Sequence, residues 1–189
     1  MRASGDVHDL LSDEGVPHEI VHLPSSSSTA QLAADALGVP VGEVVKSLVF
    51  VLDDRRPVMA LVTGDATVDA GALAREAGAA EVRLARSGEV REFTGYRPGA
   101  VSPVALETDL PVIADPGVFG PDVVYCRAAR RRLCSGSAAR IWRRCSGRAS
   151  CPSRSVGDAQ PDGRVGASTD GAAPAVQGGD PRTKWRTGR

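Results

Sequence analysis

The amino-acid composition changes abruptly after Tyr125, and this change limits which part of the chain can fold. Residues 1–125 carry 9 Lys and Arg residues against 19 Asp and Glu residues, a net charge of −10, whereas residues 126–189 carry 14 against 4, a net charge of +10. The second part is rich in Gly, Ser, Ala and Arg. With few large apolar side chains, it buries too little surface to offset a chain entropy of about 1–2 kcal/mol per ordered residue. We therefore expect one folded domain over residues 1–125 and a disordered tail over residues 126–189.

The spacing of the cysteines and the length of the apolar runs argue against a zinc site and a membrane span. Cys126, Cys134, Cys145 and Cys151 lack C-x-x-C spacing, and no histidine lies among or after them. This pattern disfavours a zinc site, and we interpret the cysteines as incidental reduced thiols. No apolar run approaches the roughly 18 residues of a membrane span, and the N-terminus lacks the features of a signal peptide. We expect a cytoplasmic protein with no metal, no cofactor and no membrane contact.

Apolar periodicity divides residues 1–125 into helices and strands. Helices are predicted near residues 7–15, 29–38, 69–78 and 87–93. Two of them carry complete end signals, with Thr29 and Asp69 as N-caps and Gly38 and Gly78 as left-handed stops. Strands are predicted at residues 18–23, 46–52, 57–64, 111–115 and 122–125, and the second and third are joined by a polar hairpin. This order predicts an α+β fold with a mixed, mostly antiparallel sheet or partial barrel and peripheral helices.

The common catalytic motifs are absent from the sequence. It contains no G-x-x-x-x-G-K-[ST] phosphate loop, no G-x-G-x-x-G dinucleotide turn and no G-x-S-x-G nucleophile elbow. His18 and His22 are predicted to face the same way on a strand, but no third ligand accompanies them. We interpret them as half-exposed strand histidines.

Two features remain as candidates for chemistry. Lys46 is the only lysine in residues 1–125 and stands at the head of the apolar run KSLVF. It is either a solvated charge at a strand end or a functional cation. The stretch TGYRPGAVSP, residues 94–103, holds two glycines and two prolines. An ordinary surface turn does not need so many residues that restrict or extend the backbone conformation. This loop is either a structural turn or a loop shaped to hold a ligand.

KSLVF, the TGD of residues 63–65 and TGYRPGAVSP occur in the order characteristic of the YbaK-type aminoacyl-tRNA deacylases. These proteins are similar to the editing domain inserted in bacterial prolyl-tRNA synthetases. The resemblance covers roughly residues 6–125. It implies hydrolysis of the ester that joins a wrong amino acid to the terminal adenosine of a tRNA. The implied partners are the 3′ end of an aminoacyl-tRNA and an aminoacyl-tRNA synthetase, and DNA is not among them.

The resemblance also assigns residues to roles. It gives Lys46 the positioning of the tRNA 3′ end, a task suited to a compact ammonium charge near phosphate. The family's G-x-x-x-P element corresponds to Gly99, Ala100, Val101, Ser102 and Pro103. Its backbone N–H groups are expected to approach the ester carbonyl, because glycine places no Cβ in the way. Further candidate substrate contacts are Thr29, Thr94, Gly95 and Asp115. The resemblance assigns water activation to the substrate's own ribose hydroxyl, and Ser102 lacks the partner base of a nucleophile.

The sequence departs from the family pattern at two places. Ala100 stands where many relatives have a second glycine, and after DVVY, residues 122–125, the pattern stops. The domain is therefore expected to lack its C-terminal segment, and the swing in charge is typical of a change of reading frame in GC-rich coding sequence. Two alternatives to an active deacylase follow: an inactive RNA-binding or synthetase-associated module, and a truncated remnant that folds poorly. The amino acid removed stays open among alanine, cysteine and serine.

Overall fold

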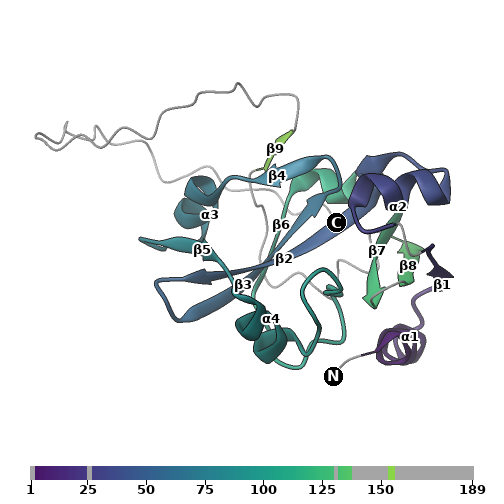
Figure 1. The fold of residues 1–189 in the computed structure, drawn as a ribbon, viewed down its shortest axis with the longest axis horizontal. Coiled ribbons are helices and arrows are strands. Elements are labelled where there is room, and N and C mark those ends of the chain that lie inside the picture. Colours follow the sequence, from purple (N-terminus) through teal and green to yellow (C-terminus); the bar gives the residue numbers. More distant parts are fainter. Residues whose placement is uncertain (1–2, 25–26, 130–131, 138–152, 156–189) are drawn as a thin grey trace, which may run out of the picture. The chain divides into compact units, whose positions relative to one another are not determined.

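A seven-stranded mixed sheet organises the chain in the computed structural model, which describes residues 3–24, 27–129, 132–137 and 153–155. The strand order is β1-β8-β7-β2-β3-β6, with β5 also paired to β2 (Figure 1). Two of the pairings are parallel, β2 with β7 and β3 with β6, and the others are antiparallel. The strands are β1 (His18–His22), β2 (Val44–Leu52), β3 (Arg56–Thr63), β5 (Val82–Leu84), β6 (Val112–Ala114), β7 (Val123–Ala129) and β8 (Arg132–Ser137).

Four α-helices flank this sheet in the described residues, which confirms the predicted α+β class. They are α1 (Ser4–Asp13), α2 (Ala30–Leu37), α3 (Ala70–Ala77) and α4 (Ser87–Thr94), and two short 3₁₀ helices are η1 (Val41–Glu43) and η2 (Pro116–Phe119). A separate antiparallel pair joins β4 (Ala66–Val68) to β9 (Ser153–Ser155). No helix of the described residues is long and apolar enough to cross a bilayer.

The predicted helix ends are confirmed for α2 and α3. Thr29 Oγ1 accepts a hydrogen bond from the Leu32 amide at 3.2 Å, and Asp69 Oδ1 accepts one from the Ala72 amide at 3.0 Å. Gly38 and Gly78 end the two helices in the left-handed region, with φ of 70° and 59°. These caps fix where α2 begins, and its first turn reaches the candidate site described below.

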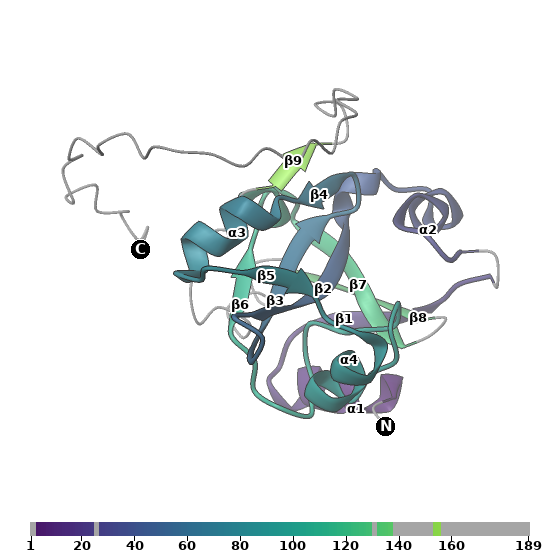
Figure 2. The same ribbon diagram turned by 60° about the vertical axis from the view of Figure 1, so that its left-hand side comes forward.

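Side-chain alternation along β2 builds the two sides of the sheet. Val45, Val49 and Val51 belong to a core that also contains α1 and α4 residues, whereas Phe50 and Leu52 pack with Leu73 of α3 on the other face. Figure 2 shows α3 on one side of the sheet and α1 and α4 on the other. A third, smaller cluster holds α2 to the sheet through Ala33 and Leu133.

The predicted domain boundary after Tyr125 is wrong, because it falls inside β7. That strand continues to Ala129, and β8 then pairs with both β7 and β1. Cys126 and Cys134 face each other across β7 and β8, are not joined by a disulfide, and are 1% and 0% exposed. The average composition of the Arg-rich tail concealed a short alternation of apolar and polar residues. The predicted disorder therefore fails for residues 126–129, 132–137 and 153–155, while residues 130–131, 138–152 and 156–189 lie outside the described residues.

Because β8 belongs to the folded domain, truncating a buried side chain of β8 should lower the stability of the whole domain. Leu133 is 1% exposed in β8, so Leu133→Ala should lower the free energy of unfolding of the full chain by about 2–4 kcal/mol. Leu84→Ala is the matched control, because Leu84 is 60% exposed and its truncation should cost less than about 0.5 kcal/mol. Urea denaturation measures both changes, and equal midpoints for the two variants would contradict the assignment of β8 to the folded domain.

Candidate functional site

An interruption along one edge of β2 creates the candidate site. On this edge β2 pairs with β7 through Val44 and Val45, and with β5 from Phe50 onward. The amide of Ala85 also donates to the Val49 carbonyl at 2.9 Å. Between these pairings, no strand of the described part of the chain pairs with residues 46–48 on this edge. The other edge of β2 is fully paired to β3, so the opening is one-sided.

A cavity of about 420 Å³ lies at this interruption. It is lined by β2, by the first turn of α2, by the glycine loop of residues 94–103 and by the ends of β7 and β8. The lining residues are Ser28, Thr29, Ala30, Gln31, Ala33, Val44, Val45, Lys46, Ser47, Leu48, Gly64, Gly99, Val101, Arg127 and Leu133. Four of the sequence-predicted residues, Thr29, Lys46, Gly99 and Val101, therefore meet at one cavity.

Lys46 is half-buried at this cavity. Its Nζ donates a hydrogen bond to the carbonyl of Ala66 in β4. Burial lowers the pKa of the Lys46 ammonium from its ordinary value, and the nearby carboxylate of Asp65 acts in the opposite direction. An ammonium held away from bulk water gains more from an anionic ligand than a fully solvated one, because screening is weaker there.

Arg127 adds a second cation that the sequence prediction missed. The half-buried side chain donates from Nη2 to the carbonyl of Ser27 at 3.1 Å. Burial lowers the pKa of its guanidinium from the ordinary value. The residue was missed because it lies beyond Tyr125, in the part predicted to be disordered. Together with the N-terminus of α2, whose backbone amides carry partial positive charge, Arg127 and Lys46 make the cavity electropositive.

The glycine loop is held by one buried aromatic side chain. Tyr96 is 1% exposed, and its hydroxyl donates to the carbonyls of Val104 and Ala105, at 3.2 Å each. Ser102 is also buried, and its Oγ accepts from the Val104 amide at 3.3 Å. Gly99 has a φ of 76° and is exposed at the cavity, where an added Cβ would meet nothing within 4 Å. The loop thus presents the Gly99 backbone to the cavity from a fixed base.

The remaining predicted residues do not line this cavity. Ala100 and Ser102 are buried in the loop, and Pro103 lines a different cavity. Thr94 and Gly95 end α4, where Thr94 Oγ1 accepts from the Tyr96 amide at 3.1 Å. Asp115 caps η2 by accepting from the Gly117 amide at 2.7 Å. The structure gives these residues roles in backbone geometry, which places them behind the site.

Gly64, from the TGD of residues 63–65, explains why that motif contains glycine. A Cβ at this position would lie 2.5 Å from the Val41 carbonyl oxygen and 3.0 Å from the Ala30 Cβ. The absence of a side chain therefore lets η1 and the start of α2 pack directly on the end of β3. This close approach sets the position of the first turn of α2, which forms one wall of the cavity.

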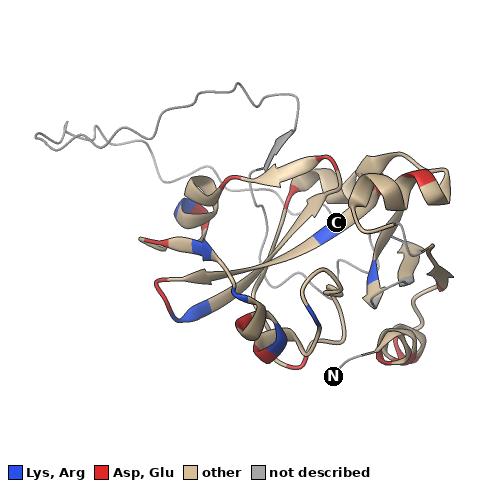
Figure 3. Ribbon diagram, in the orientation of Figure 1, with Lys and Arg blue, Asp and Glu red and all other residues tan. Residues whose placement is uncertain are grey.

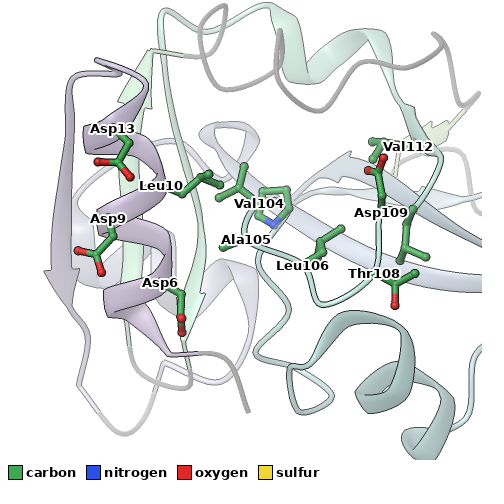
Figure 4. Close-up of a pocket in the computed structure, with 12 residues that line it drawn as sticks. Asp6, Asp9, Leu10, Asp13, Val104, Ala105, Leu106, Thr108, Asp109 and Val112 are labelled. Carbon is green, nitrogen blue, oxygen red and sulfur yellow. The ribbon is translucent and has the colours of Figure 1, made fainter.

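A second cavity, of about 490 Å³, lies between α1 and the segment that follows the glycine loop. Figure 4 shows Asp6, Asp9 and Asp13 along α1, with Leu10 and Val104 beside them and Asp109 across the cavity. Four carboxylates repel a phosphate, so this cavity has the wrong sign for nucleic acid. Acidic residues are also spread over α2, α4 and the β2–β3 turn (Figure 3). Of the two cavities, the one at β2 is therefore the electropositive one.

Comparison with known proteins identifies the family to which the chain is similar. A family model described as aminoacyl-tRNA editing domain matches residues 25–134. The chain is 37% identical over 95 residues to the proline--tRNA ligase of Trichlorobacter lovleyi and 28% identical over 108 residues to that of Aquifex aeolicus. These matches cover 50% and 57% of this chain but only 16% and 19% of the ligases.

A solved structure extends the similarity to the whole described fold. It is a crystal structure of a candidate trans-editing enzyme for prolyl tRNA synthetase, 33% identical, with a TM-score of 0.72. The alignment covers 78% of this chain and 94% of that chain. The family match also runs nine residues past the predicted stop after Tyr125, so the family pattern includes β7 and part of β8.

The close contact at Gly64 gives a testable consequence. Gly64→Ala forces the Val41 backbone to shift, and we expect a loss of about 1–3 kcal/mol in the free energy of unfolding. Amide exchange should accelerate in α2, because its first turn rests on the same contact. Gly5→Ala in α1 is the control, since an added Cβ there meets nothing within 4 Å and should leave stability equal or slightly higher. Unchanged α2 protection in Gly64→Ala would contradict this account.

Proposed function

The chain belongs to the aminoacyl-tRNA editing domain family, and we propose that it hydrolyses the ester bond of mischarged tRNA in trans, as a proofreading aminoacyl-tRNA deacylase. One observation carries the proposal: Lys46, the Gly99 backbone and the first turn of α2 converge on a single cavity at the open edge of β2. This cavity combines positive charge at its wall with a largely apolar interior. These two features complement the negative charge of an RNA 3′ end and the small size of an aminoacyl group, respectively.

The reaction needs few protein groups. A water oxygen attacks the ester carbonyl, the bond between the carbonyl carbon and the ribose oxygen breaks, and that oxygen leaves with a proton as a ribose hydroxyl. The products are a free amino acid and an uncharged tRNA. The protein's main contributions are to hold the ester and to stabilise the negative charge that develops on the carbonyl oxygen.

The glycine loop is suited to that second task. Tyr96 and Ser102 hold the loop on the side away from the cavity, so the backbone groups of Gly99 and Val101 are oriented before the substrate arrives. The Ala100 amide is already paired with the Arg97 carbonyl. Preorganised donors of this kind are worth about 3–4 kcal/mol each, because they need no reorganisation when charge develops. Lys46 and Arg127 lie on other walls of the cavity, where they are available to phosphate groups at the 3′ end.

The substrate and the partner follow from the relatives' names. The two ligases act, as named, on proline and its tRNA, and the solved structure is described as serving prolyl tRNA synthetase. We therefore propose that the substrate is the tRNA for proline when it carries a wrong amino acid. We propose prolyl-tRNA synthetase as the functional partner and the cytoplasm as the location. Support for action in trans comes from the solved structure, a candidate trans-editing enzyme of which this chain covers 94%.

Removal of the Lys46 charge tests the binding role. Lys46→Met keeps the apolar stem but loses the ammonium, so kcat/KM for a misacylated tRNA should fall about tenfold or more through a higher KM and a lower kcat. Arg55→Met is the control, because it removes an exposed cation from the β2–β3 turn and should leave kcat/KM unchanged. A panel of alanyl-, cysteinyl- and seryl-tRNA measures both, and equal kinetics for the two variants would remove Lys46 from the site.

A side chain at Gly99 separates catalysis from binding. Gly99→Asn adds a side chain at a residue that lines the cavity, and asparagine tolerates a positive φ better than most residues. The deacylation rate should fall about a hundredfold, the scale of one displaced donor, with little change in tRNA affinity.

Gly78→Asn is the matched control for Gly99→Asn. Gly78 also has a positive φ, of 59°, and open space at its Cβ, but it ends α3 and does not line the cavity. Gly78→Asn should lose as little stability as Gly99→Asn but should keep the wild-type deacylation rate. If rate and affinity fall together in Gly99→Asn, the loop is a binding element and the inactive RNA-binding module is the better interpretation.

A further inference from the structure

Ser47 carries an unsatisfied hydroxyl at the cavity wall. Its Oγ is buried and has no hydrogen-bond partner within the described ranges, a state shared by no other described side-chain N or O atom. The residue lines the cavity on β2, directly after Lys46. Buried hydroxyls are nearly always hydrogen-bonded, because leaving one unpaired costs the full loss of its hydration. A ligand atom in the cavity is the natural partner for this group.

The face of β2 from which Ser47 projects identifies the kind of ligand atom. Alternate residues of a strand share a face, so Ser47 projects from the same face as Val45 and Val49. Those two valines belong to the core that also contains Val101 of the glycine loop. Lys46 projects from the opposite face, toward β4. The hydroxyl is therefore on the side of the loop proposed to approach the ester carbonyl, and the ammonium is on the side available to phosphate.

We propose that the Ser47 hydroxyl donates a hydrogen bond to the ester carbonyl oxygen of the aminoacyl group, opposite the Gly99 loop. This assignment rests on the proposed deacylase function and adds a catalytic residue to it. A neutral hydroxyl among valines is poorly suited to a phosphate, which needs positive charge to replace its hydration. It is well suited to a neutral carbonyl that becomes negative in the transition state, because the bond then strengthens as the reaction proceeds.

Threonine and valine at position 47 provide the sharpest test. The two side chains have nearly the same shape, and only threonine keeps the hydroxyl. With the misacylated tRNA that the wild-type chain hydrolyses, Ser47→Thr should retain kcat within about threefold, whereas Ser47→Val should lose about tenfold or more. KM for the tRNA should change little in either variant, because the phosphate contacts lie on the other face.

Stability gives an independent readout that a merely structural serine would not produce. Ser47→Ala removes an unpaired buried hydroxyl, so its midpoint of urea unfolding should equal or exceed that of the wild type while its kcat falls. A structural role predicts the reverse, with lower stability and a normal rate per folded molecule. That reverse result would overturn the proposal.

Two further outcomes distinguish the possible failures. If the wild-type chain hydrolyses a misacylated tRNA and Ser47→Val matches Ser47→Thr, the Ser47 assignment is wrong and the deacylase function stands. If the wild-type chain hydrolyses none of the alanyl, cysteinyl and seryl esters, the function fails and the assignment fails with it. An N-acetylated aminoacyl-tRNA serves as a third arm. A Ser47→Val defect that disappears with this substrate would move the hydrogen bond to the α-ammonium group and overturn the carbonyl assignment.

Discussion

The divergence of β7 and β5 along one edge of β2 is the constraint on which the site depends. A central strand normally has both edges paired, because each unpaired backbone group that is buried costs free energy. Here β7 pairs with the start of β2 and β5 with its end, and the residues between them face a cavity. The same three residues, Lys46, Ser47 and Leu48, therefore supply an ammonium, a hydroxyl and an apolar wall, and the interruption gives a ligand access to side chains from both faces of one strand.

The glycine loop meets this opening from the other side, and its rigidity comes from contacts outside the cavity. Tyr96 is anchored to two carbonyls further along the chain, so the loop is closed on itself before any ligand binds. Ala100, where the family resemblance led us to expect a second glycine, is 6% exposed and its amide donates to the Arg97 carbonyl at 3.0 Å. Its Cβ therefore does not need space in the cavity, and the substitution is compatible with a stiff loop that presents Gly99.

Local signals predicted the parts of the fold that depend on a few neighbouring residues. The caps at Thr29 and Asp69 and the left-handed glycines after them are short-range chemistry, and the structure has them as predicted. β4 and β5 are three residues long and were not predicted, because so short a run has no measurable period. β8 was missed because its stability comes from pairing with β1, over 100 residues earlier in the chain. Arg127 was missed because the predicted boundary after Tyr125 cuts β7 in two. Ser47 was identified only from the structure, where its buried hydroxyl has no partner among the described residues.

On the proposed function, the charge distribution of residues 1–125 bears on how the domain would select one end of a nucleic acid. Residues 1–125 carry a net charge of −10, from 9 basic and 19 acidic residues, so broad contact with an RNA surface is unfavourable. The positive groups at the cavity are few and partly desolvated, and such charges act strongly over a short range and weakly beyond a Debye length of about 8–10 Å. A duplex body placed against this surface meets mostly carboxylates, whereas a single-stranded 3′ end that enters the cavity meets Lys46, Arg127 and the first turn of α2. If the chain acts on tRNA as proposed, this charge distribution favours a single-stranded terminus over a duplex.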